Sequence, residues 1–193
     1  IDALSVLTPM FVSQTQYEVS EYYREIASET NLPIIIYNNR PKTNVTVEPA
    51  TVAKLAEIDN IIGVKDSTGD MTNTEEYLRL TRGMDNFHVM MGRDTLIYAA
   101  LCYGASGAIA SCANVAVDIY EKFRAGDAAG ALDAQFRFSA LRIATNMGTF
   151  PVVLKEALKL IGHDCGDCVK PIQPLNDEQR ARLKKVLVDM GLL

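Results

Sequence analysis

The chain has 193 residues, of which 48% are hydrophobic and 22% are charged, and its formal net charge is −5. This balance is typical of a globular protein that is large enough to form one sizeable core. It shows no basic stripe that would suit nucleic acid, no apolar run long enough to cross a membrane, and no visible signal peptide. We therefore expect a cytoplasmic protein with neither nucleic acid nor a membrane as its partner.

Short apolar runs alternate with longer amphipathic segments through the first half of the chain. The apolar runs are residues 3–7, 33–37, 61–65, 87–91 and 107–111. None of them alternates between apolar and polar residues, which is typical of parallel strands buried on both faces. Apolar residues at helical spacing occupy the segments between them, at residues 16–28, 49–57, 72–82 and 94–103. This order predicts an α/β fold in which right-handed crossovers join parallel strands.

The second half of the chain has a helical pattern only. Helices are predicted at residues 115–125, 127–144, 150–161 and 177–190, and Asn176 or Asp177 can cap the last of them. We therefore divide the chain into an α/β domain at residues 1–125 and a C-terminal helical domain at residues 126–193.

Two architectures fit five parallel strands. One is an open doubly wound sheet, which should carry a Gly-x-Gly-x-x-Gly turn after its first strand, but none follows Leu7, Tyr37 or Lys65. The other is a (β/α)8 barrel whose first three strands precede Ile1. Because the chain opens without a methionine and directly in a strand-like run, we expect it to be a piece of a longer chain.

The ends of the predicted strands hold the candidate catalytic groups, as they do in barrel enzymes. Lys65 ends a strand that should be buried, and loss of solvent favours the neutral amine that attacks a ketone and forms a Schiff base. Tyr37 ends the preceding strand, where its phenol could relay protons. Each residue also has a structural interpretation, as a lysine that reaches solvent and as a core aromatic with a satisfied hydroxyl.

The cysteines carry a separate set of hypotheses. Cys102 and Cys112 lie in apolar segments and look like small core residues. Cys165 and Cys168 form a Cys-x-x-Cys motif shortly after His163, which allows three metal ligands, a redox pair or a plain turn between helices. A zinc ribbon would need a second ligand pair, and the sequence has none, so the expected metal site is none.

Taken together, Tyr37-Asn38 and Lys65 within IIGVKDSTGD resemble the dihydrodipicolinate synthase and N-acetylneuraminate lyase family. Lys65 follows Tyr37 by 28 residues, which is the family's spacing, and the resemblance runs essentially from end to end. It includes Leu7-Thr8-Pro9, Gly92-Arg93-Asp94, GAIAS with Asn114, and FPVVLKEAL. Members are class I aldolases, lyases and dehydratases of pyruvate or related 2-keto acids. The resemblance implies a TIM (β/α)8 barrel, of which this chain supplies the fourth to the eighth strand, followed by the helical extension.

The resemblance also implies roles for individual residues. Lys65 matches the Schiff-base lysine, and Tyr37 matches the tyrosine that shuttles protons and touches the substrate carboxylate. The implied substrate contacts are Thr8 on the first strand, Lys42 at the mouth of the site, Ile109 through its backbone near the keto acid, and Gly92, Asp94 and Ser111 along the distal part of a longer substrate.

Three departures separate this chain from a standard synthase. The Gly-Thr-Thr or Gly-Ser-Thr loop that cradles the pyruvate carboxylate belongs to the second barrel strand and is absent here. Phe11 replaces a tyrosine that joins a proton relay across a subunit interface. Lys42, with Arg40 nearby, replaces an arginine and so loses the bidentate fork for a carboxylate.

The leading hypothesis is therefore a Schiff-base lyase that acts on pyruvate and an aldehyde-type co-substrate, without any cofactor. A 2-keto-3-deoxy sugar-acid aldolase or dehydratase, an N-acetylneuraminate lyase-like enzyme and a non-catalytic keto-acid binder remain open. Besides a Schiff-base enzyme and a non-catalytic binder, the third class of protein considered is an unrelated doubly wound protein that binds a phosphorylated ligand. The resemblance further implies a homo-oligomer, either a dimer or a tetramer.

Overall fold

The computed structural model describes all 193 residues, which form two compact units, Ile1–Ile109 and Ala110–Leu193. Every strand lies in the first unit, and the second contains helices only. The division falls earlier than the sequence-based boundary after residue 125, because the helix at Asp118–Arg124 packs against the next helix of the chain. No helix of either unit is long and apolar enough to cross a membrane.

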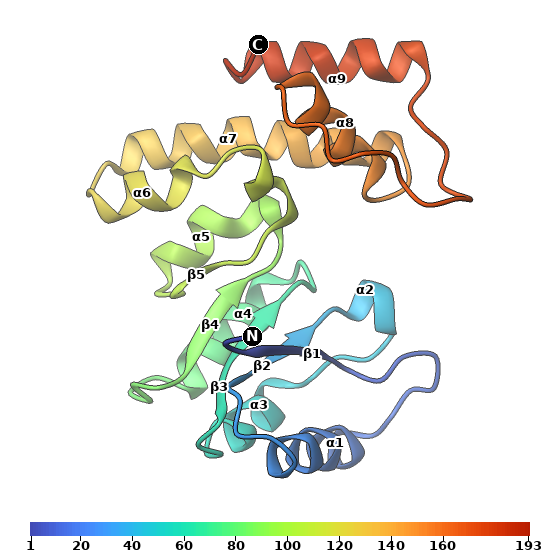
Figure 1. Ribbon diagram of the computed structural model, residues 1–193. Helices are drawn as coiled ribbons and strands as arrows, with labels where there is room; N and C mark the ends of the chain where they lie inside the picture. The colour runs from blue at the N-terminus through green and yellow to red at the C-terminus, as the bar shows by residue number, and fades with distance from the viewer. The chain divides into compact units, whose positions relative to one another are not determined.

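The N-terminal unit is built on a five-stranded sheet, whose strands are all parallel, as expected (Figure 1). The strands are β1 (Leu4–Leu7), β2 (Ile34–Asn38), β3 (Ile61–Asp66), β4 (His88–Met91) and β5 (Gly107–Ala108). Their order in the sheet follows their order in the chain. A doubly wound sheet reverses its strand order at a switch point, and this sheet has no such reversal.

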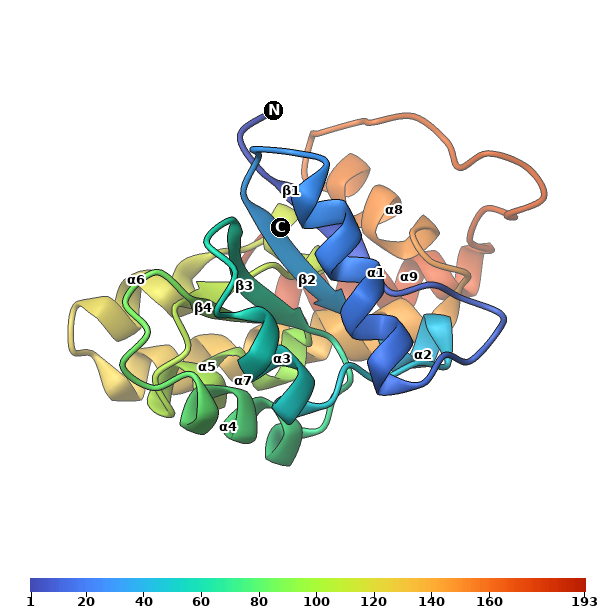
Figure 2. The ribbon, with the colours of Figure 1, turned by 90° about the horizontal axis from the view of Figure 1, so that it is seen from below.

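Three helices cover one face of this sheet: α1 (Gln16–Ser28), α3 (Pro49–Leu55) and α4 (Met71–Leu80). Figure 2 shows all three on the same side of the strands. Their apolar side chains meet those of the strands in one core, formed by Val19, Tyr23, Ala27, Ile34, Ile36, Val45, Val47, Val52, Leu55, Ile61, Val64, Tyr77, Phe87 and Val89. Full burial of a side chain of this size contributes about 1.5–3 kcal/mol.

The opposite face of the sheet is less covered than the sequence predicted. Ile35 and Tyr37 on β2, Lys65 on β3 and Met90 on β4 are only half-buried. The expectation of burial on both faces is wrong for this unit, because the helices of its core pack on one face alone. The half-buried face is therefore where polar side chains can meet a ligand.

Several predicted elements are shorter in the structure, and one short α-helix and the 3₁₀ helices at Ser111–Asn114 and Thr145–Met147 were not predicted. The expected strand at residues 107–111 keeps only two residues, because β5 pairs with β4 through Gly107 and Ala108 alone. The helix expected at residues 94–103 is divided into η1 (Asp94–Leu96) and α5 (Ile97–Cys102). The additional α-helix is α2 (Arg40–Thr43), a single turn with a proline near its start.

The C-terminal unit begins with η2 (Ser111–Asn114) and contains α6 (Asp118–Arg124), α7 (Ala128–Ala144), η3 (Thr145–Met147), α8 (Val152–Leu160) and α9 (Asp177–Asp189). Within this unit α7 packs against α6 and α9, and α8 packs against α9. Asn176 caps α9 as predicted: its Oδ1 accepts a hydrogen bond from the Gln179 backbone N–H at 2.9 Å, and the Gln179 side chain accepts one in return.

The buried Tyr77 hydroxyl gives a test of the N-terminal core. It donates to the Val47 carbonyl and accepts a hydrogen bond from Asn38 Nδ2 at 2.8 Å. Burial raises the pKa of this phenol. In Tyr77→Phe both partners lose a buried bond, so we expect the free energy of unfolding to fall by about 1–3 kcal/mol in urea denaturation. Tyr17→Phe, at a side chain that is 74% exposed, is the control, and an equal effect of both changes would contradict this role of Tyr77.

Candidate functional site

Tyr37 and Lys65 lie opposite each other on neighbouring strands. The parallel register of β2 and β3 pairs Tyr37 with Lys65, and it pairs Asn38 with Asp66 one position later. Because side chains alternate along a strand, each pair projects on its own face of the sheet. Tyr37 and Lys65 share the half-buried face, whereas Asn38 and Asp66 are buried on the face of the helices.

The Lys65 amine lies over the aromatic ring of Tyr37. Its Nζ is 3.9 Å from the centroid of the ring, which is within the range of a cation–π contact. The Tyr37 hydroxyl accepts a hydrogen bond from Asn39 Nδ2 at 2.9 Å. The lysine predicted as nucleophile and the tyrosine predicted as proton shuttle are therefore in contact, and the orientation of the phenol is set from the other side.

Buried hydrogen bonds on the helix-covered face of the sheet fix the ends of β2 and β3. Asp66 is 1% exposed, and its carboxylate accepts bonds from Thr74 Oγ1 at 2.7 Å, Asn73 Nδ2 at 3.2 Å and the Thr68 backbone N–H at 3.0 Å. These bonds tie the end of β3 to the first turn of α4. A carboxylate with this many donors has little freedom, so the residue before it, Lys65, has a fixed backbone.

The end of β2 is tied in the same way. The Asn38 side chain donates to the Tyr77 hydroxyl and accepts a bond from the Val47 backbone N–H at 3.2 Å. The Asn38 carbonyl accepts from the Ser67 backbone N–H at 2.8 Å, which joins β2 to the segment after β3. Together with the bonds to Asp66, this network fixes the two backbones that carry Tyr37 and Lys65.

Gly92, at the end of β4, lies close against the Lys65 strand. Its backbone N–H donates to the Asp66 carbonyl at 2.7 Å. A Cβ at this position would be 2.0 Å from Ser67 Oγ and 3.1 Å from Lys65 Cε. A glycine is required here because any side chain would displace the nucleophile or the hydroxyl beside it.

Ser67 was missed by the sequence reasoning. It is 9% exposed, and its Oγ is buried without a hydrogen-bonding partner. A buried hydroxyl without a partner is uncommon, and here it lies beside Gly92 and two residues after Lys65. The polar run Asp66-Ser67-Thr68 directly after a buried strand was the available signal, but only the structure shows which of its hydroxyls has no partner.

Thr8 is a second buried hydroxyl without a partner. It follows β1, is 2% exposed, and its Oγ1 makes no hydrogen bond. The register pairs Leu7 with Tyr37, so Thr8 comes directly after the residue that neighbours the tyrosine. Its predicted role as a substrate contact stays a prediction.

Arg40 and Lys42, on α2, line a cleft of about 550 Å³ together with Asn44, Thr46, Thr68, Asp70 and Asn73. Lys42 is thus placed beside the loop that follows Lys65. Both cations are exposed, and this polar cleft suits a ligand that carries hydroxyl or carboxylate groups.

The remaining predicted contacts are distributed over both units. Asp94 is buried at the start of η1, three residues after the end of β4. Ile109 is 40% exposed, and its backbone N–H donates to the Met91 carbonyl at 2.9 Å. Ser111 is the first residue of η2 in the C-terminal unit. The structure therefore groups Lys65, Tyr37 and Gly92 at one edge of the sheet, and the predicted role of Ser111 stays a prediction.

Phe11 lies on the loop after β1. Its side chain is 97% exposed, and its backbone φ of 77° lies in the left-handed region that a bulky residue rarely adopts. It has no hydroxyl to take part in a proton relay. No group of three or more His, Cys, Asp or Glu side chains is arranged to hold a metal ion.

Comparison with known proteins places the whole chain in one family. Residues 1–190 match the model of the dihydrodipicolinate synthetase family. A 4-hydroxy-tetrahydrodipicolinate synthase from Methanothrix thermoacetophila is 32% identical over 98% of this chain and 65% of its own length. The chain thus spans about two thirds of the length of the relatives it matches.

Solved structures agree with this match. Dihydrodipicolinate synthase from Thermotoga maritima superposes with a TM-score of 0.92 at 28% identity, over 100% of this chain and 67% of its own. The enzyme from Acinetobacter baumannii, solved in complex with pyruvate, gives 0.91 at 29% identity over the same shares of the two chains. From the match of residues 1–190 and the agreement of the fold, the chain belongs to the dihydrodipicolinate synthetase family.

Proposed function

We propose that the whole protein is a Schiff-base lyase that acts on pyruvate or a related 2-keto acid, in the manner of a 4-hydroxy-tetrahydrodipicolinate synthase. The observation that carries this proposal is the contact between the Lys65 amine and the Tyr37 ring, 3.9 Å apart at the carboxyl edge of the sheet. Imine formation requires a primary amine as nucleophile and a nearby proton donor, and this site has both on backbones fixed by buried hydrogen bonds.

The proposed reaction begins when the neutral Lys65 amine attacks the keto carbon. Loss of water from the carbinolamine gives an iminium ion, and Tyr37 donates the proton that this water carries away. The iminium then withdraws electrons, so the Tyr37 phenolate removes a proton from the neighbouring methyl group and an enamine forms. The enamine carbon attacks the carbonyl carbon of an aldehyde, and Tyr37 returns the proton to the aldehyde oxygen. Hydrolysis of the new iminium restores the amine, and the proton it releases restores the Tyr37 phenol. Because the iminium accepts the electron pair, no cofactor is needed.

The five parallel strands in chain order, with core helices on one face, support the proposal that they are the fourth to eighth strands of a (β/α)8 barrel. In such a barrel the half-buried face that carries Lys65 would become the interior. The Gly-Thr-Thr or Gly-Ser-Thr loop implied for the substrate carboxylate would come from the second barrel strand, so activity tests must use the whole protein.

The proposal also covers the substrates, the oligomeric state, the location and the partners of the enzyme. The family resemblance and the pyruvate complex of the Acinetobacter baumannii relative support pyruvate as substrate. The aldehyde-type co-substrate, a homodimer or homotetramer, a cytoplasmic location and the absence of a nucleic-acid partner are further parts of the proposal. The net charge of −5, without a basic stripe, supports the absence of a nucleic-acid partner.

The cleft beside α2 favours one variation on this function. Phe11 cannot relay a proton, and Lys42 has no bidentate fork at the position where a standard synthase has an arginine, while Arg40 lines the same cleft. The hydroxyl and amide groups in the same cleft suit a polyhydroxylated chain. A 2-keto-3-deoxy sugar acid is therefore the second candidate substrate, and it would use the same lysine.

Borohydride trapping tests the nucleophile directly. We expect the whole protein, incubated with pyruvate and then reduced, to carry one pyruvate-sized adduct on the peptide that contains Lys65. Lys65→Ala should lose both the adduct and turnover, whereas Lys54→Ala, at an exposed lysine of α3, should keep both. An adduct only with longer 2-keto acids would favour the sugar-acid enzyme. No adduct with any keto acid would leave a binding protein without catalysis.

Tyr37→Phe tests the proton shuttle. The variant keeps the aromatic ring under Lys65 but lacks the hydroxyl, so the amine retains its contact and loses the proton donor. We expect kcat to fall by about 10²–10⁴-fold, while borohydride still traps the imine after longer incubation. Tyr17→Phe is the matched control. Turnover of Tyr37→Phe at the parent rate would remove the phenol from the mechanism.

Gly92→Ala tests the close approach beside the nucleophile. The new Cβ would lie 2.0 Å from Ser67 Oγ, so we expect the rate of imine trapping to fall sharply. The double variant Gly92→Ala, Ser67→Ala removes that oxygen and should recover part of the trapping rate, because the contact of 2.9 Å with the Asp66 carbonyl remains. If Ser67→Ala gives no recovery, the clash with the hydroxyl is not what disables the site.

A further inference from the structure

The loop between α8 and α9 holds a pair of cysteines that the proposed reaction does not use. Residues 163–169 are neither helix nor strand. Cys165 is exposed and Cys168 is half-buried, and both are free thiols. The cleft along this loop has a volume of about 200 Å³ and is lined in part by Cys168.

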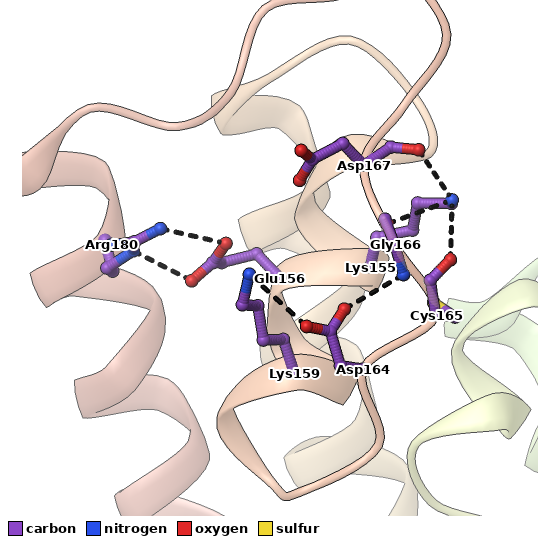
Figure 3. Close-up of polar contacts among 8 residues, drawn as sticks. All are labelled: Lys155, Glu156, Lys159, Asp164, Cys165, Gly166, Asp167 and Arg180. Atoms are coloured by element: carbon purple, nitrogen blue, oxygen red, sulfur yellow. Dashed lines mark hydrogen bonds and ion pairs between the residues drawn. The ribbon is translucent and has the colours of Figure 1, made fainter.

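One lysine holds this loop in a curled shape. Lys155 Nζ donates to three successive backbone carbonyls, those of Cys165 at 3.1 Å, Gly166 at 3.1 Å and Asp167 at 3.0 Å (Figure 3). An ammonium group has three N–H donors, so these bonds use all of them. Asp164 adds a further link, since its Oδ1 accepts from the Gly166 backbone N–H at 2.9 Å.

The curl makes the path between the two cysteines shorter than that of an extended chain. Fully extended, three peptide links span roughly 10 Å, whereas a disulfide requires Cα atoms roughly 4.4–6.8 Å apart. Gly166 has a positive φ of 74°, which turns the chain away from the extended path between the cysteines. The backbone must also curve for three successive carbonyls to reach one nitrogen atom. This curvature favours a disulfide between Cys165 and Cys168 over an extended loop.

The cleft beside Cys168 has a small excess of cations. Lys155, Lys159 and Lys170 line it together with the carboxylates Glu156 and Asp167. Glu156 is paired with Arg180 at 2.8 Å, and Lys159 is paired with Asp164 at 3.4 Å (Figure 3). Cysteines that react with disulfides lie in partly exposed, electropositive surroundings of this kind. Exposure, curvature and charge therefore favour the same chemistry at one loop.

We propose that Cys165 and Cys168 form a reversible dithiol–disulfide site that reacts with small-molecule disulfides such as oxidised glutathione. The exposed Cys165 thiolate attacks one sulfur of the oxidant, and a mixed disulfide forms as one thiol leaves. Cys168 then attacks the Cys165 sulfur and expels the second thiol. Two protein thiols are oxidised and one small-molecule disulfide is reduced to two thiols, so electrons and protons balance.

The test is oxidation of the purified protein with oxidised glutathione, followed by alkylation, intact mass and peptide mapping. We expect two of the four thiols to be lost, with one bond joining Cys165 to Cys168 and complete reversal by dithiothreitol. Cys168→Ser should stop at a stable glutathione adduct on Cys165, because the thiol that would displace the glutathione is missing. Cys102→Ser, at an exposed lone cysteine, is the control and should still form the bond.

Other products would overturn the proposal. These are free thiols at both positions after oxidation, separate glutathione adducts on Cys165 and Cys168 in the parent protein, or a bond from either residue to Cys102 or Cys112.

A second pair of variants tests the role of the lysine. Lys155→Met removes one charge and all three carbonyl bonds, whereas Lys170→Met removes a charge from the same cleft without breaking those bonds. We expect the equilibrium for disulfide formation, measured in glutathione redox buffers, to shift several-fold toward the dithiol in Lys155→Met and much less in Lys170→Met. Equal shifts would show that the curl held by Lys155 does not prepare the pair.

Discussion

The parallel register between β2 and β3 is the constraint on which the candidate site depends. It places Tyr37 opposite Lys65 on one face and Asn38 opposite Asp66 on the other. The buried pair is bonded into the helix layer, and a buried polar group that has lost its bonds is costly. A slip of one residue would bury the lysine among apolar side chains and expose the bonded carboxylate, so the network specifies the register.

The half-buried and the buried faces of these strands therefore have different roles. On the buried face, Asp66 and Asn38 use their hydrogen-bonding capacity within the protein. On the other face, Lys65 and Ser67 are left with capacity for a ligand, and Gly92 leaves the space that they need. Rigid support beneath reactive groups is what keeps such groups within reach of a productive geometry.

In the C-terminal unit, too, side-chain hydrogen bonds fix a backbone segment that carries reactive groups. Lys155 satisfies three carbonyls that have no helix or strand to bond them, and the loop between Cys165 and Cys168 takes its shape from that ammonium. The Lys155 ammonium thus satisfies backbone carbonyls that hydrogen bonds within a helix or sheet would otherwise satisfy.

The sequence by itself determined the order of strands and helices, the candidate nucleophile and its tyrosine partner. The order of the elements follows from local periodicity, which needs no knowledge of distant contacts. Position at a strand end left structural interpretations of Lys65 and Tyr37 open, and the resemblance to a known family is what singled these two residues out. Element ends were less predictable: β5 and α5 are shorter than expected, because strand pairing and 3₁₀ turns decide where they begin and end. Only the tertiary structure showed that Lys65 lies over the Tyr37 ring, that Ser67 lacks a partner and that Lys155 holds the Cys165 loop. Each of these depends on atoms that packing brings together from different elements, and sequence spacing carries no information about such distances.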